Sequence, residues 1–188
     1  MSTEVDICNI ALHRIGAERI TSLADTTKRA KICNDLYSFE RDLLLREHPW
    51  NFATARVALA KTANTPLFGF TGEFQLPADY IRVIDTEFGD YEDFEFRIEA
   101  DKLLCDESSI KIEYIFKATD TSKFDAKFIE TLALRIASRL AYSMVNSATL
   151  QDRIYNEADI ALRNARLYDA QEGSARKFLK SDWTNVRF

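Results

Sequence analysis

Glycine, proline, histidine and cysteine are all scarce in this sequence, and each shortage narrows what the chain can do. Its 188 residues include 5 glycines, 3 prolines, 2 histidines and 3 cysteines. Motif inspection finds no glycine-rich phosphate loop, no His-Glu-x-x-His metal motif and no nucleophile elbow. The cysteines are widely spaced and odd in number, which favours buried thiols over a disulfide framework or a metal site. The sequence therefore predicts no catalytic residue, no cofactor and no metal ion, and we expect a protein that is not an enzyme.

Long hydrophobic runs are also missing. No apolar stretch approaches the roughly 18 residues that a membrane-spanning helix requires. The first residues, MSTEVD, lack the basic start and apolar segment of a secretory signal. We expect a chain that is synthesised in the cytoplasm and does not bind a membrane.

What the sequence does contain is typical of a folded domain. Hydrophobic residues make up 46% and charged residues 29% of the chain. A chain of this length can bury roughly 70% of its unfolded surface, which is enough for one well-packed core. The sequence predicts a single domain over residues 1–173, followed by a C-terminal arm over residues 174–188.

Apolar residues at helical spacing predict four helices. The two longest end the domain and form a hairpin, each introduced by a capping-box pattern, Ser122 to Asp125 and Thr149 to Asp152. Gly16 and Gly173 are placed to end helices in the left-handed conformation. The predicted helices cover approximately residues 3–15, 25–48, 122–146 and 149–172.

Between the second and third predicted helices, the period of the apolar residues changes from helical to alternating. Short alternating segments separated by turn-like residues predict antiparallel strands over about residues 52–117. The fold class predicted is therefore α+β: a bundle of long antiparallel helices with an inserted antiparallel sheet and an extended C-terminal arm.

Charge is divided unevenly along the chain. Residues 61–120 carry 14 acidic and 6 basic side chains, a net charge of −8, whereas the rest of the chain has a net charge of +3. Asp90, Glu92 and Asp93 lie in a predicted acidic turn of this middle region. They lack the glycine and terminal glutamate of an EF-hand loop, so a solvated acidic surface is favoured over a calcium site.

The arm is the strongest candidate for binding another protein. Aromatic and basic residues are what binding hot spots use, and too few apolar residues are present to form a separate core. The alternative is that the arm folds back onto its own domain. The candidate docking residues are Arg176, Lys177, Phe178, Leu179, Lys180, Trp183 and Phe188.

Arg135 and Arg139 form a like-charged pair four residues apart on the third predicted helix. Such a pair is slightly unfavourable in isolation. Either both side chains face solvent, or a neighbouring chain supplies carboxylates and the two arginines make inter-subunit contacts.

Four stretches of the sequence, taken in order, resemble the head-to-tail adaptor proteins of tailed phages, in particular the tail tubular protein A group of podoviruses. They are NIALHRIGAERITSL at 9–23, WNF at 50–52, FQLPADYIRV at 74–83, and ALRNAR at 161–166 with DAQE at 169–172. Residues 85–107 match nothing in that pattern.

The resemblance implies a structural virion protein of the phage neck. It implies a ring, expected to be a dodecamer, that docks on the portal protein through the C-terminal arm and presents its sheet to the tail nozzle or tube protein. Duplex DNA would pass through the ring during genome ejection without sequence-specific binding, and acidic walls would ease that passage. Two alternatives remain open: a head-completion or DNA-retaining plug protein, and an intracellular regulatory module that binds a protein partner.

Overall fold

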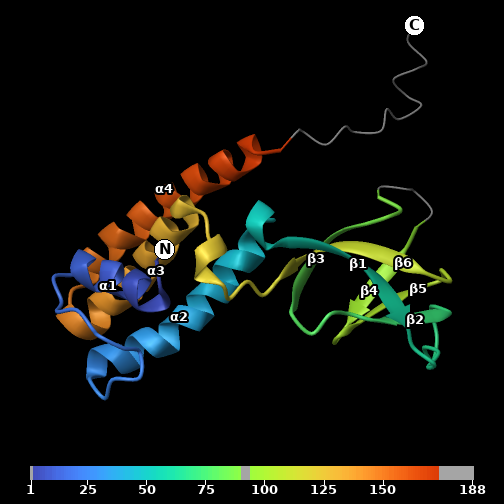
Figure 1. The fold of residues 1–188 in the computed structure, drawn as a ribbon, viewed down its shortest axis with the longest axis horizontal. Coiled ribbons are helices and arrows are strands. Elements are labelled where there is room, and N and C mark those ends of the chain that lie inside the picture. The colour runs from blue at the N-terminus through green and yellow to red at the C-terminus, as the bar shows by residue number, and fades with distance from the viewer. Residues whose placement is uncertain (1, 90–93, 174–188) are drawn as a thin grey trace, which may run out of the picture.

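The computed structural model describes residues 2–89 and 94–173. Within them it is an α+β fold in which a six-stranded antiparallel sheet is inserted between the second and third of four helices. Figure 1 shows the helices gathered at one end of the molecule and the sheet at the other. The fold class predicted from the sequence is confirmed. The helices are α1 (Glu4–Arg14), α2 (Lys28–Glu47), α3 (Ala126–Val145) and α4 (Ala148–Gln171), with short 3-10 turns at Asn51–Ala53 and Thr121–Lys123.

Both ends of α1 are closed by local hydrogen bonds. The Thr3 hydroxyl accepts from the Asp6 amide at 3.1 Å, and the Asp6 carboxylate accepts from the Thr3 amide at 2.9 Å, which completes a capping box. The Thr3 amide and, at 2.8 Å, the Thr3 hydroxyl both donate to the Asp6 carboxylate, which holds the pKa of Asp6 below its usual value. At the other end Gly16 has a φ of +71°, and the Ala17 amide donates to the Leu12 carbonyl at 3.0 Å. The helix stop predicted at Gly16 is confirmed.

The capping boxes predicted for the last two helices are wrong. The side chain that caps α3 is Asp125, which accepts from the Lys127 amide at 2.7 Å. Ser122 instead lies in the preceding 3-10 turn, where its amide donates to the Asp120 carboxylate at 3.0 Å. The cap of α4 is Ser147, two residues before the predicted Thr149.

The predicted helical hairpin is confirmed, and its turn is very short. Asn146 adopts a left-handed conformation with a φ of +54°, and its amide donates to the Tyr142 carbonyl at 3.0 Å. Ser147 then caps α4, so two residues separate the helices. Helix α4 ends at Gln171, and its C-cap is Glu172 with a φ of −78°. The left-handed conformation predicted for Gly173 is wrong, because Gly173 does not have a positive φ.

Helix α3 lies at the centre of the larger hydrophobic core. Its predicted apolar stripe is fully buried, and both α1 and α2 pack against it as well as α4. Small residues on α4 face the same core and allow the two helix backbones to approach closely. The stripe on α3 is Phe128, Leu132, Ile136 and Leu140, and the small residues on α4 are Ala158, Ala161 and Ala165.

The strands follow one another in the sheet in the order β3-β6-β1-β2-β5-β4, and each neighbouring pair is antiparallel. Strands β1 and β6 pair in a regular register in which Arg56 of β1 is opposite Glu113 of β6. Irregularities interrupt the pairing of β3 with β6. The strands are β1 (Thr54–Lys61), β2 (Gly72–Gln75), β3 (Tyr80–Thr86), β4 (Phe96–Glu99), β5 (Lys102–Cys105) and β6 (Ile110–Phe116).

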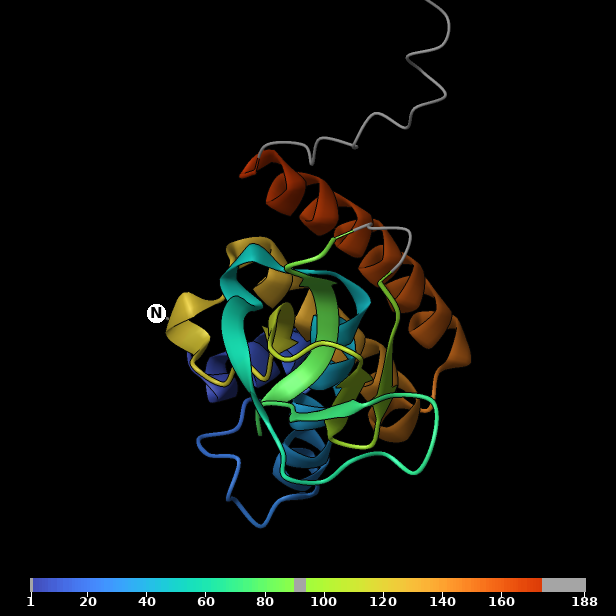
Figure 2. The same cartoon turned by 90° about the vertical axis from the view of Figure 1, so that its right-hand side faces the viewer.

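The sheet curls around a smaller core of its own, as the rotated view in Figure 2 shows. Phe74, Leu103 and Ile112 are fully or almost fully buried in it. Phe94, in the segment that precedes β4, stacks on Phe88, just beyond β3, with ring centroids 4.5 Å apart. This contact lies between the two edges of the sheet and supports the curl.

Candidate interaction surfaces

Most of the side chains that the sequence marked as functional lie outside the described residues. These are the seven docking residues of the arm, within 174–188, and the acidic turn residues Asp90, Glu92 and Asp93. The proposals that rest on them stay predictions. Of the candidate residues, Arg135 and Arg139 are described.

The structure supplies both of these arginines with carboxylates from the same chain. Arg135 makes two hydrogen bonds to Glu47, at 2.6 and 2.7 Å, and Arg139 donates to Glu40 at 2.9 Å. Glu47 also accepts from Arg166 of α4 at 3.4 Å. Of the two alternatives, the one in which a neighbouring chain supplies the carboxylates loses its support, because Glu47 and Glu40 of α2 supply them within the same chain.

The end of α4 is fixed to the junction between α2 and β1. Asp169, which is buried, accepts from the Asn51 amide at 3.0 Å and lies 3.0 Å from His48 Nε2. The Asp169 carbonyl accepts from the Asn51 side chain at 2.7 Å. Trp50, between these two partners in sequence, is fully buried and donates its indole N–H to the Leu44 carbonyl at 2.8 Å. The last turn of α4, just before residue 174, is therefore held near the boundary between the helices and the sheet.

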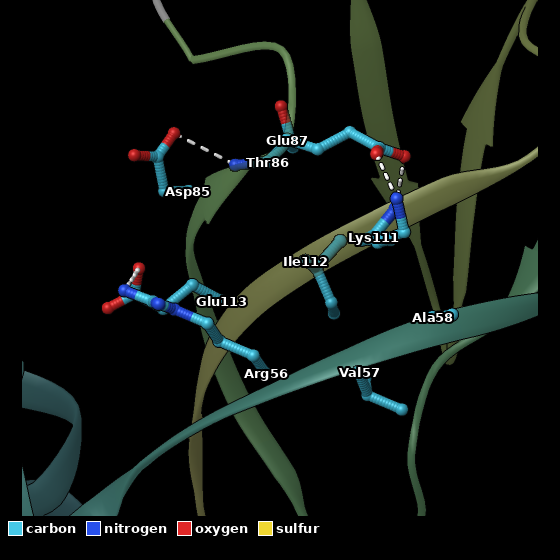
Figure 3. Close-up of a pocket in the computed structure, with 9 residues that line it drawn as sticks. All are labelled: Arg56, Val57, Ala58, Asp85, Thr86, Glu87, Lys111, Ile112 and Glu113. Atoms are coloured by element: carbon cyan, nitrogen blue, oxygen red, sulfur yellow. Dashed lines mark hydrogen bonds and ion pairs between the residues drawn. The ribbon is translucent and has the colours of Figure 1, made fainter.

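A recess of about 430 Å³ lies on the face formed by β1, β6 and the end of β3. Figure 3 shows its charged side chains reaching toward one another across the strands. Lys111 bonds to Glu87 at 2.7 Å, and Arg56 approaches Glu113 at 3.4 Å. The hydrogen bond from Lys111 holds the pKa of Glu87 below its usual value.

The recess is lined by three carboxylates, a lysine and an arginine, which are Asp85, Glu87, Glu113, Lys111 and Arg56. Its lining contains no histidine, cysteine or serine, and the carboxylates drawn in Figure 3 are engaged by neighbouring basic or backbone groups. Val57, Ala58 and Ile112 supply the apolar part of its lining. The arrangement is that of a mixed polar and apolar protein surface.

The most exposed apolar side chains occur in the loop between β1 and β2. Leu67 is 99% exposed and Phe68 is 84% exposed, and Gly69 follows them with a φ of +89°. This loop lies at the end of the sheet that is far from the helices, as Figure 1 shows. The sequence analysis did not identify either residue as part of an interaction surface, because apolar side chains in a loop are usually expected to be buried. Because Leu67 and Phe68 are adjacent and both exposed, they form a small contiguous apolar patch, which makes the loop a candidate interaction surface.

The loop borders a second and larger recess, of about 760 Å³, whose lining is acidic. Lys102 bonds to Glu73 at 2.7 Å, which lowers the pKa of Glu73 and raises that of Lys102. Five acidic and two basic side chains line the recess, which gives it a net charge of −3. They are Glu73, Glu95, Glu99, Asp101 and Asp106, with Arg97 and Lys102.

The cysteines and histidines form no chemical site in the part of the chain that the structure describes. Cys8, Cys33 and Cys105 are buried and free, as predicted. A hydrogen bond with Cys33, together with burial, raises the pKa of Cys8, and burial raises that of Cys105. Residues 2–89 and 94–173 contain no group of three or more potential ligands placed to hold a metal ion. No helix in these ranges is long and apolar enough to cross a membrane.

The comparisons with protein families and with curated proteins found no relative of this chain. No protein-family model matches the chain, and no curated protein matches it.

Proposed function

We propose that this chain is a structural subunit of a tailed-phage neck, a head-to-tail adaptor that forms a ring on the portal and joins it to the tail nozzle or tube. It performs no catalysis and needs no cofactor. Its C-terminal arm, residues 174–188, binds the portal protein, and duplex DNA passes through the ring. Support comes from the resemblance of four sequence stretches and from a fold in which the sheet is inserted between helices in the order that the resemblance implies.

The observation that carries the proposal is the attachment of α4 to the α2–β1 junction through Asp169. A docking arm that leaves from a rigid point loses less conformational entropy on binding than one that leaves from a flexible segment. The three contacts of Asp169 with His48 and Asn51 provide such a point, because they fix the last turn of α4 against both the helices and the start of the sheet. Two of the four resembling stretches, 50–52 and 169–172, meet at this junction.

Removal of the arm tests the docking role directly. A chain that ends at Gly173 should keep its circular dichroism spectrum and melting temperature but should no longer co-sediment with the portal protein of the same phage. A matched full-length variant, Trp183→Ala with Phe188→Ala, removes two aromatic anchors and should weaken co-sedimentation without shortening the chain. Unchanged co-sedimentation of the truncated chain would refute docking through the arm.

Assembly into a ring is tested by imaging. Negative-stain electron microscopy of the full chain mixed with portal rings should show an added ring below the portal with the symmetry of that portal, expected to be twelvefold. Particles in which the portal stays bare at saturating protein would count against the adaptor role.

The acidic middle of the sequence is proposed to face the DNA channel or its rim. Acidic groups repel phosphate and therefore let duplex DNA move without the strong binding that basic groups would cause. Reversing the charge of Asp90, Glu92 and Asp93 to lysine should slow genome ejection and reduce infectivity. Neutral replacement by Asn and Gln is the matched control and should have a smaller effect. An unchanged ejection rate in the lysine variant would contradict the channel position.

A further inference from the structure

Two exposed apolar surfaces on this chain have complementary charge. The first, here called the loop tip, is Leu67 and Phe68 between β1 and β2. It stands beside the acidic recess, where Glu95, Asp101 and Asp106 contribute to a net charge of −3. A partner for the loop tip must therefore offer apolar surface together with positive charge.

The second surface, here called the outer face of α4, lies on the side of that helix that points away from the helical core. Ile160 and Leu167 are 56% and 58% exposed on it, and they are seven residues apart, which places them on the same side about 10 Å from one another. Arg163 lies between them and is exposed. The salt bridges found among the described residues do not include Arg163. The outer face of α4 thus combines two apolar side chains with Arg163, and Ile160 also lines a recess in which Arg14 and Lys127 balance Glu130 and Glu157.

We propose that the loop tip of one copy of this chain docks on the outer face of α4 of the next copy. Leu67 and Phe68 would cover Ile160 and Leu167, and Arg163 would meet the acidic side chains that border the tip. Because the two surfaces differ, the contact is head-to-tail, and repetition of such a contact gives a closed ring or an open filament. The inference deepens the proposed function by naming the contact between ring subunits. It rests on the proposed function only in one respect, which is that the ring in the phage neck would be the assembly in which this contact occurs.

The geometry of the chain is compatible with this arrangement. The loop tip is at the sheet end of the molecule, whereas α4 belongs to the helical end, so one copy cannot cover its own α4 with its own loop (Figure 1). The surface area buried by one such contact is small, so two free copies would associate weakly. In a closed ring every copy is held on both sides, and that raises the effective concentration of each contact.

A membrane and a symmetric dimer fit the observations less well. The acidic recess beside the loop tip would be repelled by anionic lipid headgroups. Two loop tips facing each other would bring two acidic recesses together, which is also unfavourable. Both are kept as outcomes of the test.

Site-directed disulfide formation tests the contact in the full chain. The three natural cysteines are buried, so cysteines introduced at the surface are the accessible thiols. Purified Phe68→Cys and Leu167→Cys chains, one carrying a size tag, are mixed at high concentration and oxidised by copper phenanthroline and dissolved oxygen. Each disulfide forms as two thiols lose two protons and two electrons to the oxidant. We expect a disulfide-linked dimer that contains both chains.

The matched control pairs Phe68→Cys with Tyr142→Cys, a side chain of similar exposure at the end of α3. The yield of the mixed dimer with Leu167→Cys should be about tenfold higher than with the control, which corresponds to about 1.4 kcal/mol of contact free energy. Adding Arg163→Glu to the Leu167→Cys chain should lower the yield. Equal yields in the test and control pairs, or no mixed dimer, would overturn the proposal.

Other results identify other occupants of the loop tip, and each overturns the proposal. Disulfide dimers of Phe68→Cys alone would indicate a symmetric contact between tips. Binding of the full chain to vesicles of anionic phospholipid, lost in Phe68→Asp, would assign the tip to a membrane. Unchanged melting temperatures of the surface variants exclude misfolding as the cause of any loss.

Measurement of portal binding distinguishes a failure of this inference from a failure of the proposed function. A Leu67→Asp, Phe68→Asp chain that still forms complete rings on portal would overturn the inference and leave the adaptor role intact. Failure of the wild-type chain to bind portal, together with formation of the disulfide between the Phe68→Cys and Leu167→Cys chains, would do the reverse.

Discussion

The hydrophobic core of the helical part of this molecule is much larger than that of the sheet part. The helical core surrounds α3 and includes Trp50 and Phe128, whose rings pack edge to face with centroids 5.1 Å apart. The sheet core is a single layer enclosed by the curl, with Phe74 as its largest fully buried side chain. Because hydrophobic stabilisation scales with the apolar area removed from water, the helical part should be the more stable of the two.

The two cores are connected through β6. Ile115 on this strand is buried in the helical core, while Ile112 and Tyr114 belong to the sheet core. Alternate side chains of one strand therefore serve different cores, as the two-residue period of a strand allows. The comparison indicates that the sheet depends on the helices for support, whereas the helices pack largely against one another.

The largest expected loss of stability comes from Trp50→Ala. Truncation of a fully buried tryptophan costs about 3–5 kcal/mol, and the Leu44 carbonyl also loses its indole donor. Chemical denaturation followed by circular dichroism would measure the change. Phe39→Ala, at an aromatic residue of α2 that is 55% exposed, is the control and should change stability by less than about 0.5 kcal/mol. Similar losses for both variants would contradict the central place of Trp50.

Phe74→Ala is expected to cost about 3 kcal/mol or slightly more and to act on the sheet first. In a Trp183→Phe background Trp50 is the one remaining tryptophan, so its fluorescence reports on the helical core. We expect the sheet signal in circular dichroism to be lost at lower denaturant than the Trp50 signal. Phe96→Ala, at an exposed residue of β4, is the control. Coincident transitions in the Phe74→Ala chain would show that the two parts unfold as one unit.

Asp169→Ala tests the connection at the α2–β1 junction and should cost about 1–3 kcal/mol. The change removes the carboxylate acceptor from the Asn51 amide and from His48, and it leaves buried polar groups without partners. Thermal melting measures the loss, and hydrogen exchange should show faster opening of the last turn of α4. Gln171→Ala, an exposed residue of the same turn, is the control. Unchanged exchange in α4 would mean that the junction does not hold the helix end.

The smallest expected effect is a pH dependence of the sheet. The pKa of Glu73 is lowered mainly by its hydrogen bond from Lys102. A carboxylate with a lowered pKa stabilises the fold above its unfolded value, and this contribution is lost as the pH falls through the folded value. In Lys102→Met, the free energy of unfolding should therefore decrease less steeply as the pH falls below about 4.3. Urea denaturation over that range measures it, and an unchanged slope would contradict a role for the pair.

The sequence allowed the four helices and the hairpin to be predicted, because long apolar stripes specify a helix face strongly. It also placed the start of α1 at Thr3, but it did not identify the residues that cap α3 and α4. Ser122 matches the capping pattern, but Asp120 satisfies its amide in a 3-10 turn and leaves Asp125 to cap α3. Competing hydroxyl and carboxylate groups within a few residues cannot be ranked without the surrounding structure.

Within the predicted strand region, β5 has no sequence signal of its own, because its residues do not alternate. Three of its four side chains, in the sequence KLLC, are buried, so the alternating pattern of a one-sided strand is absent. The strand order also could not be predicted, since β1 pairs with β6 across more than fifty residues of sequence. The exposure of Leu67 and Phe68 depends on the same long-range arrangement, and so the loop tip became visible only in the structure.

The central position of α3 has a consequence for how the protein is made. Helices α1 and α2 leave the ribosome first, but the helix that both pack against is encoded more than seventy-five residues after the end of α2. During that interval the apolar faces of the nascent α1 and α2 lack their main partner, and the intervening sheet residues emerge before the helical core can close. Chaperone contact with the emerging chain is therefore expected to be strongest before α3 appears and to fall sharply once the α3–α4 hairpin is complete.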